Sequence, residues 1–217
     1  MIEKSTKKRI LDAAEKLFAL HGFDGTSLRA ITTEAKVNLA SVNYHFQTKE
    51  ALVDAVMARR LEVVNRRRLE MLAEAEHAAG ANPPRLERTL EAFYRPALEL
   101  LRSPEAKYFP MLMGRLITET ALFQRLFESH LVEVERRFRA AIRRALPDLP
   151  PPDLAWRMLF TIGILTQSLA AQPVLQAVLR KASSPCDVDG TVARMVAFAS
   201  AGLRAPVHKE VGKCAQG

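Results

Sequence analysis

The sequence predicts an all-α fold, and three observations carry that prediction. Apolar residues recur at helical spacing over long stretches, alternation of β-branched and polar residues is almost absent, and only 9 of the 217 residues are Gly. Hydrophobic residues make up 48% of the chain and charged residues 26%, as in ordinary globular proteins. This length suits one large domain, or a small domain followed by a larger one.

The first fifty residues predict three helices. The first is expected to begin after Ser5 or Thr6 and to end at Gly22. Its apolar face comprises Ile10, Ala14, Leu17, Phe18 and His21. A second helix starts after Thr26 or Ser27 and buries Leu28, Ile31 and Ala35; a turn over residues 36–38 leads to a third, Leu39 to Phe46. Two short helices joined by a tight turn are the layout of a helix-turn-helix, whose second helix enters the DNA major groove.

A long fourth helix is expected next, capped by Thr48. No Pro or Gly interrupts the chain from there to about Ala79. At a rise of ~1.5 Å per residue this gives a rod of roughly 48 Å, long enough to join two domains. The segment from Gly80 to Pro84 ends it.

The remaining chain predicts a larger helical region. We expect helices over residues 83–101, with a kink at Pro96, and over 103–120, interrupted near Pro110. One long amphipathic helix follows over 121–146, and Asp153 caps another that continues to about Ala171. A short helix over 174–181 and a last one over 187–203 complete the set.

Charge and composition favour some partners and argue against others. The formal net charge of +8 suits a polyanionic partner, although residues 1–50 hold eight Lys or Arg against six Asp or Glu. Lys4, Lys7, Lys8 and Arg9 form a short basic arm. The two cysteines, Cys186 and Cys214, fit a reducing cytoplasm. The start of the chain is not a signal peptide, and the apolar run over 158–171 is too short for a bilayer span, so we expect a cytoplasmic protein.

Catalytic and metal-binding motifs are missing from the sequence. There is no G-x-G-x-x-G, P-loop, G-x-S-x-G or H-E-x-x-H, and the five histidines show no ligand spacing beyond His130-x-x-Glu133. We therefore expect no enzyme, no cofactor and no metal site.

Residues 7 to 55 resemble the DNA-binding domain of the TetR family of bacterial transcription regulators. The resemblance rests on Gly22-Phe23-Asp24-Gly25-Thr26-Ser27 and on the run from Asn43 to Leu52, NYHFQTKEAL. The family usually has Gly where Lys36 stands, and commonly Gly or Pro where Ala40 stands. If Lys36 adopts a left-handed conformation, it carries a strain cost.

The resemblance implies operator DNA as partner. Residues expected to contact the DNA backbone are Thr26, Ser27, Tyr44, His45 and Lys49. Candidates to face base edges are Arg29, Asn38, Leu39, Ala40, Ser41 and Asn43. A core role for Tyr44 and a structural hydrogen bond for His45 are the alternatives.

The resemblance also divides the chain into a helix-turn-helix domain (1–50), a helical ligand-binding and dimerisation domain (51–205) and a flexible tail (206–217). Ligand-binding candidates in the second domain are Phe93, Tyr94, Phe109, Met113, Arg115, Leu116, Glu119, Phe123, Phe127 and Trp156. Arg115 and Glu119 either anchor a polar head group or form an exposed i,i+4 pair, and we favour the pair. The helices over 153–171 and 187–203, rich in small residues, are expected to form a four-helix bundle in a homodimer.

The expected function is that of a ligand-responsive regulator. It would repress transcription by binding a palindromic operator as a dimer, and a small apolar effector would release it. The stretch from Phe93 to Glu119 is also similar to a subgroup that senses fatty acids or acyl-CoA, although a drug-like or aromatic effector fits the composition equally. Activation, and a non-DNA interaction protein with the same fold, are the other hypotheses.

Overall fold

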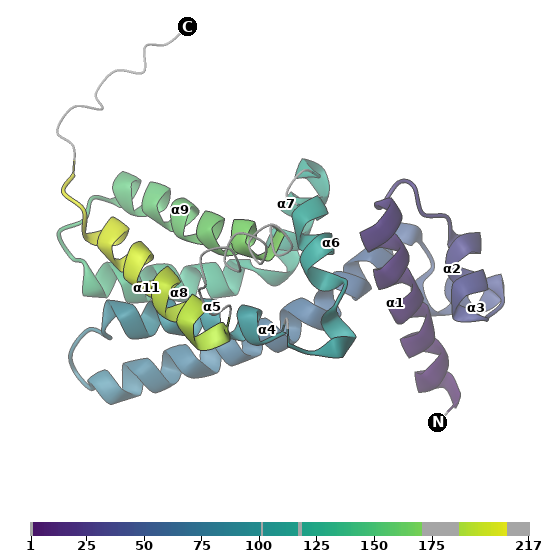
Figure 1. The fold of residues 1–217 in the computed structure, drawn as a ribbon, viewed down its shortest axis with the longest axis horizontal. Helices are drawn as coiled ribbons and strands as arrows, with labels where there is room; N and C mark the ends of the chain where they lie inside the picture. Colours follow the sequence, from purple (N-terminus) through teal and green to yellow (C-terminus); the bar gives the residue numbers. More distant parts are fainter. Residues whose placement is uncertain (1, 101, 117–118, 171–186, 208–217) are drawn as a thin grey trace, which may run out of the picture.

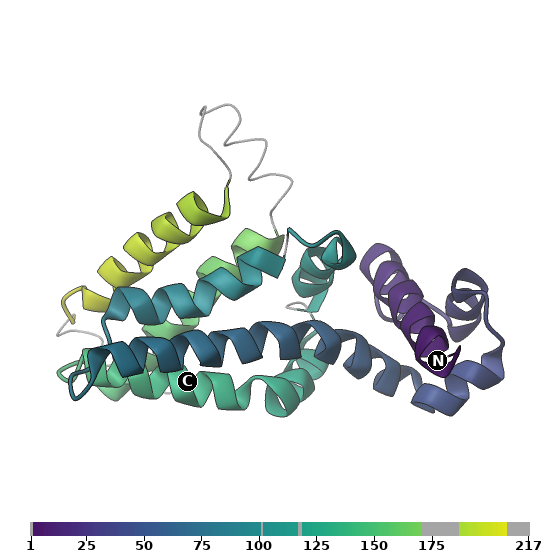
Figure 2. The same ribbon diagram turned by 90° about the horizontal axis from the view of Figure 1, so that it is seen from below.

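The computed structural model describes residues 2–100, 102–116, 119–170 and 187–207, and within these ranges the chain is helical without strands, which confirms the all-α prediction. Helices α1 (Ile2–His21), α2 (Leu28–Ala35) and α3 (Leu39–Phe46) form a head at one end of the molecule (Figure 1). Helix α4 (Lys49–Ala79) leaves the head and runs along the body, as the second view shows (Figure 2).

Side-chain caps start the three helices that follow α1. Ser27 accepts a hydrogen bond from Ala30 N at 3.1 Å, Asn38 from Ser41 N at 2.8 Å and Thr48 from Ala51 N at 3.0 Å. These bonds satisfy amide groups that the first turn of a helix leaves without an intrahelical partner. The predicted bounds of α2, α3 and α4 are confirmed.

Three residues with positive φ, Gly22, Lys36 and Gln47, end helices in the head. Gly22 has φ +82°, and its amide donates to Phe18 O at 2.9 Å, so it ends α1 as predicted. Lys36 ends α2 at φ 53° and ψ 50°, the left-handed conformation that disfavours a side chain. The predicted start of α1 after Ser5 or Thr6 is wrong, because the helix already begins at Ile2.

The basic residues of the expected arm, Lys4, Lys7, Lys8 and Arg9, are therefore part of α1. No Gly or Pro precedes them to stop the helix. His21, expected on the apolar face of this helix, is exposed at its end.

The body consists of α5 (Leu86–Leu100), a 3-10 turn η1 (Pro104–Ala106), α6 (Phe109–Leu116), α7 (Thr120–His130), α8 (Val132–Ala145), α9 (Pro151–Ala170) and α11 (Val188–Arg204). Helix α5 continues through Pro96, and Pro110 lies in the first turn of α6, where the missing N–H costs no helical bond. Helix α9 begins at Pro151, so Asp153 lies in its first turn instead of capping it.

The long helix predicted over 121–146 is wrong, since the chain breaks at Leu131 between α7 and α8. The cause is tertiary: Asn65 Nδ2 on α4 donates to the His130 carbonyl at 2.8 Å, and the His130 ring lies 2.9 Å from Asp54 Oδ1. These contacts hold the end of α7 against α4. The helix expected over 174–181 and most of the expected tail, residues 208–217, lie outside the described residues.

One buried cluster joins the head to the body. It contains Ile10, Phe18 and Ile31 of the head together with Leu112 and Leu116 of α6. A second cluster packs α5, α9 and α11 around Leu90, Tyr94 and Leu165. Burial of each such apolar side chain contributes about 1.5–3 kcal/mol to the free energy of unfolding.

The predicted boundary between the helix-turn-helix domain and the second domain, at residues 50 and 51, stays a prediction. No helix in the described part of the chain is long and apolar enough to cross a membrane.

Candidate functional site

The outer surface of α3 carries most of the residues expected to face DNA. Val42 and Phe46 are buried and fix the helix to the head, whereas Leu39, Ala40 and Asn43 are exposed and Tyr44 is 74% exposed. This exposure leaves no core role for Tyr44. The helix therefore presents one free face, whose dimensions suit the major groove.

The first turn of α3 is rigidly capped. The side-chain oxygen of Asn38 accepts hydrogen bonds from the Ser41 backbone N–H at 2.8 Å and from the Ser41 hydroxyl at 2.7 Å. The oxygen atoms of these two candidates are thus engaged within the protein.

The remaining head candidates lie at the end of α3 and on the segments next to it. Ser27, the cap of α2, and Arg29 on α2 are exposed. His45 on α3 is half-buried with its ring 5.2 Å from that of Tyr44, and Lys49 Nζ lies 3.4 Å from the Asp24 carbonyl oxygen. The structure corrects the placement of the Thr26 side chain. This residue is buried, and its hydroxyl donates to the carbonyls of Leu17 and Gly22. These hydrogen bonds close the loop after α1.

Arg9 supports the strained turn before α3, a role that the sequence did not reveal. Its Nε and Nη2 donate to the Ala35 carbonyl at 3.0 and 2.7 Å, and Nη2 also donates to the Lys36 carbonyl. A cation at these carbonyls compensates the C-terminal end of α2. The basic character of this residue was the only sequence signal.

A buried ion-pair network fixes α1 to α4. Glu15 is 2% exposed and accepts from Arg60 Nε at 3.1 Å and from Arg59 Nη2. Arg59 also pairs with Asp12 at 2.6 Å, and Arg60 Nη2 donates to the Glu105 carbonyl in η1. The head is therefore held to both the rod and the body.

Arg115, expected near the ligand or in a surface pair, instead joins the body to the head. Its Nε donates to the Ala19 carbonyl at 2.8 Å and its Nη2 to the Leu20 carbonyl at 3.0 Å, both at the end of α1. Glu119 is exposed and directly precedes α7.

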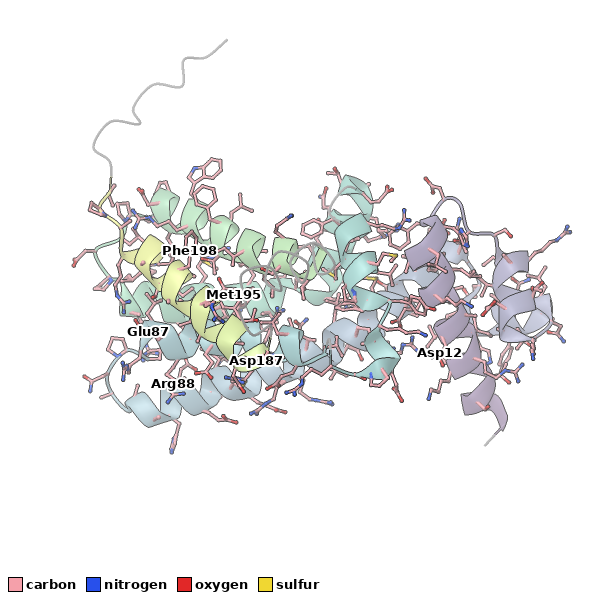
Figure 3. All side chains as sticks on the ribbon, in the orientation of Figure 1. Asp12, Glu87, Arg88, Asp187, Met195 and Phe198 are labelled. Carbon is pink, nitrogen blue, oxygen red and sulfur yellow. The ribbon has the colours of Figure 1, made fainter. Side chains whose placement is uncertain are left out.

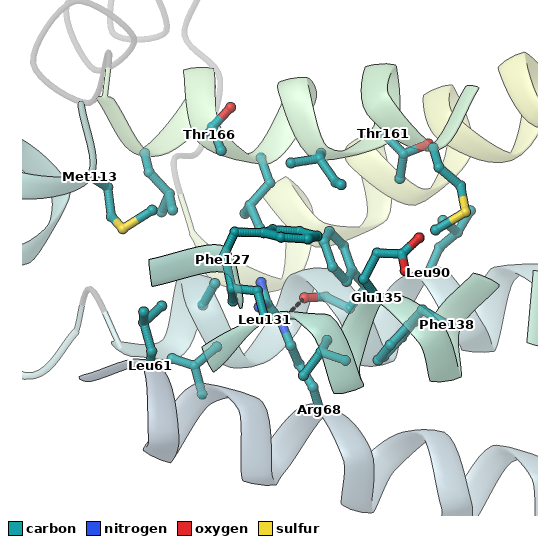
Figure 4. A pocket seen from close by; sticks show the side chains of 18 of the residues that line it. Leu61, Arg68, Leu90, Met113, Phe127, Leu131, Glu135, Phe138, Thr161 and Thr166 are labelled. Carbon is teal, nitrogen blue, oxygen red and sulfur yellow. Dashed lines mark hydrogen bonds between the residues drawn. The ribbon is translucent and has the colours of Figure 1, made fainter. Parts of the chain in front are cut away.

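A cavity of about 120 Å³ lies inside the body between α4, α5, α6, α7, α8 and α9 (Figure 4). Its walls are mostly apolar. The predicted ligand residues that line it are Phe93, Phe109, Met113, Phe123 and Phe127. The sequence missed the contributions of α8 and α9, such as Phe138 and Met158, because they depend on how those helices turn toward α4.

Three other predicted ligand residues lie elsewhere. Tyr94 is fully buried in the second cluster, where its hydroxyl donates to the Thr161 carbonyl at 3.1 Å and burial raises the tyrosine pKa above its ordinary value. Leu116 belongs to the cluster shared with α1. Trp156 is 61% exposed on α9. Each is directed away from the cavity by the face of the helix on which it stands.

Among the described residues, four polar side chains line the cavity: Arg68, Glu135, Thr161 and Thr166 (Figure 4). The two threonine hydroxyls donate to carbonyls of their own helix, at 2.8 Å for Thr161 and 3.2 Å for Thr166. Arg68 Nε donates to the Phe93 carbonyl at 2.9 Å, and its guanidinium lies 4.4 Å from the centre of the Phe93 ring. No signal in the sequence distinguishes Arg68 from the other arginines of α4.

An apolar surface covers part of α9 and α11. Trp156, Leu159 and Phe160 are more than half exposed on α9, and Phe198 is 72% exposed on α11 (Figure 3). The rings of Trp156 and Phe160 are 6.0 Å apart. Exposed aromatic clusters of this kind mark association surfaces.

Family comparisons match both ends of the chain. Residues 10–56 match the family described as "Bacterial regulatory proteins, tetR family", and residues 91–202 match "Tetracyclin repressor-like, C-terminal domain". The second match covers more than half of the chain.

Among curated proteins, the chain is 41% identical over 54 residues to the probable HTH-type transcriptional regulator YttP of Bacillus subtilis, covering 25% of this chain and only 26% of that protein. It is 30% identical over 129 residues to the uncharacterized HTH-type transcriptional regulator TtgW of Pseudomonas putida, covering 59% of this chain and 81% of TtgW.

Solved structures share the fold. A TetR-like transcriptional regulator from Rhodococcus sp. RHA1 aligns with TM-score 0.61 and 21% identity over 91% of this chain and 95% of that one. The fatty acid degradation regulator FadR from Bacillus halodurans aligns with TM-score 0.68 and 13% identity over 93% and 97%. At these identities the likeness concerns the fold alone.

Proposed function

This chain belongs to the TetR family of bacterial regulatory proteins, and from that premise we propose that it is an effector-controlled transcription regulator that binds operator DNA as a homodimer. The single observation that carries the DNA-binding part is the exposed face of α3, anchored by Val42 and Phe46 and flanked by the capped start of α2. Regulation of this kind works through binding, and we expect no catalytic step and no cofactor.

The proposed DNA contacts divide by chemistry. Ser27, Tyr44, His45 and Lys49 contact phosphates and position the head, while Arg29 and the exposed side chains of α3 reach base edges. For Thr26 we propose only a backbone contribution, since its hydroxyl is engaged inside the head.

The proposed dimer uses α9 and α11. Their exposed apolar residues would become buried between two subunits, and two helices from each would form a four-helix bundle. A two-fold dimer requires a palindromic operator whose half-sites lie about one DNA turn, or a multiple of it, apart.

The proposed effector binds in the cavity, and α6 transmits its presence. Met113 and Phe109 of α6 line the cavity, while Arg115 and Leu116 of the same helix contact α1. A ligand that displaces α6 would thus reorient the head and lower operator affinity, with a coupling of about 1–3 kcal/mol. We propose an apolar effector such as a fatty acid or acyl-CoA and a repressor role; a drug-like or aromatic effector and activation are the alternatives.

The test is a fluorescence titration of the protein onto a duplex carrying its own upstream region, at several salt concentrations. Tyr44→Ala and Lys49→Ala should weaken binding, and Lys49→Ala should lower the salt slope by about 1, because each neutralised phosphate releases counterions. Arg88→Ala is the matched control, since it removes an exposed charge from α5, far from the head (Figure 3). Unchanged binding in both head variants would contradict this DNA-binding surface.

A further inference from the structure

Only two charged side chains line the described walls of the cavity, and they differ in whether an opposite charge is bound to them. Glu135 on α8 is paired with Arg139, whose Nε lies 2.6 Å from the Glu135 carboxylate, so its charge is compensated. Arg68 on α4 is 6% exposed and lines the same cavity (Figure 4).

Among the described residues, the side chains and carbonyl groups that Arg68 contacts by hydrogen bonding or stacking are neutral. Nε donates to the Phe93 carbonyl at 2.9 Å, Nη1 donates to Asn65 Oδ1 at 3.2 Å, and the guanidinium stacks on the Phe93 ring. Burial lowers the pKa of Arg68 to about 10, without an opposing shift from any carboxylate, and the group stays charged at neutral pH. Residues 171–186, outside the described part, contain no Asp or Glu.

A buried charge without an ion partner is costly, and a ligand that brings the opposite charge recovers part of that cost. A guanidinium suits a carboxylate because both groups are planar and can form parallel hydrogen bonds. The apolar walls around it, including Leu61, Phe127 and Phe138, suit a hydrocarbon or aromatic body.

We propose that the effector is an apolar molecule with a free carboxylate, and that Arg68 binds this carboxylate inside the cavity. The inference rests on the proposed function, because it specifies the ligand of the same cavity. It favours the free acid over its coenzyme A thioester, whose acyl carbonyl is uncharged.

The experiment measures ligand binding by calorimetry without DNA, so that failure of this inference is distinguished from failure of operator release. Two matched pairs are compared: decanoate with 1-decanol, and 4-phenylbutyrate with 4-phenylbutanol. Decanoyl-CoA is a fifth ligand. For the unaltered protein we expect at least one acid to bind about 10- to 100-fold more tightly than its alcohol, as for hydrogen bonds to charged groups.

Arg68→Gln should abolish this preference while keeping alcohol binding, because Gln retains a donor for the Phe93 carbonyl but not the charge. Arg67→Gln is the matched control: the neighbouring side chain is exposed and paired with Glu74 and Glu70, and the preference should remain. Arg68→Lys, which keeps the charge, should retain part of the preference; its folding and that of Arg68→Gln are checked by thermal unfolding.

Equal binding of acid and alcohol by the unaltered protein overturns the inference but leaves an effector cavity in place. Tighter binding of decanoyl-CoA than of decanoate overturns the free-carboxylate assignment. Binding of none of the five ligands overturns the inference as well. Acid binding that depends on Arg68 but leaves operator affinity unchanged supports the inference and contradicts the proposed regulation.

Discussion

The network around Glu15 allows a quantitative prediction about how the head is held to the rod. Glu15→Ala leaves Arg60 buried without its carboxylate; the two side chains are 2% and 10% exposed. Removing one partner of a buried ion pair costs about 3–5 kcal/mol, because the other charge stays out of water. Since Arg60 keeps its bond to the Glu105 carbonyl and Arg59 keeps Asp12, we expect the lower end, about 3 kcal/mol.

Asp12→Ala is the matched control in the same network. Its side chain is 50% exposed and also pairs with Arg59, so its removal should cost about 0–1 kcal/mol. Both free energies of unfolding are measured by equilibrium denaturation at one fixed chain concentration, since association shifts apparent stability. In a thermal scan about 3 kcal/mol corresponds to a decrease of roughly 6–12 °C for a chain of this size. If Glu15→Ala costs no more than Asp12→Ala, the buried pair does not hold α1 to α4 as argued.

Three further predictions follow from other contacts. Lys36→Gly should raise the free energy of unfolding by about 0.5–1 kcal/mol, because relief of the left-handed strain exceeds the added entropy of the unfolded chain; a decrease on chemical denaturation would contradict the strain. The ion pair with Arg204 lowers the pKa of Glu87, so its stabilisation is present above the ordinary carboxyl pKa and is lost as the pH falls through the lowered value. Glu87→Gln should thus be less stable at neutral pH, and denaturation across pH should find this difference vanishing in acid; a difference that persists would refute the pairing. Trp156→Asp should dissociate the proposed dimer in sedimentation while Val63→Asp, at an exposed position on α4, should not; equal behaviour of the two would exclude the α9 surface.

The sequence determined the elements whose limits are set by local chemistry. The bounds of α2 and α4 could be predicted because Ser27 and Thr48 cap their first turns and because α4 contains no breaker. The bounds of α3 followed from the turn over residues 36–38, in which the structure shows Asn38 as the cap. The exposed surface of α3 was predictable from apolar spacing, because Val42 and Phe46 lie one turn apart and decide which side of the helix is buried. The aromatic and methionine content of the cavity could likewise be anticipated from composition.

Tertiary structure decided everything that depends on contacts between distant parts of the chain. The break at Leu131 follows from bonds that α4 makes to His130, and Arg115 contacts α1 only because α6 packs there. Arg68 looks like any other arginine of α4 until Phe93, from another helix, covers its guanidinium. Helical periodicity fixes the face on which a residue lies, but burial and charge pairing depend on what that face meets, and this is set by packing over long sequence separations.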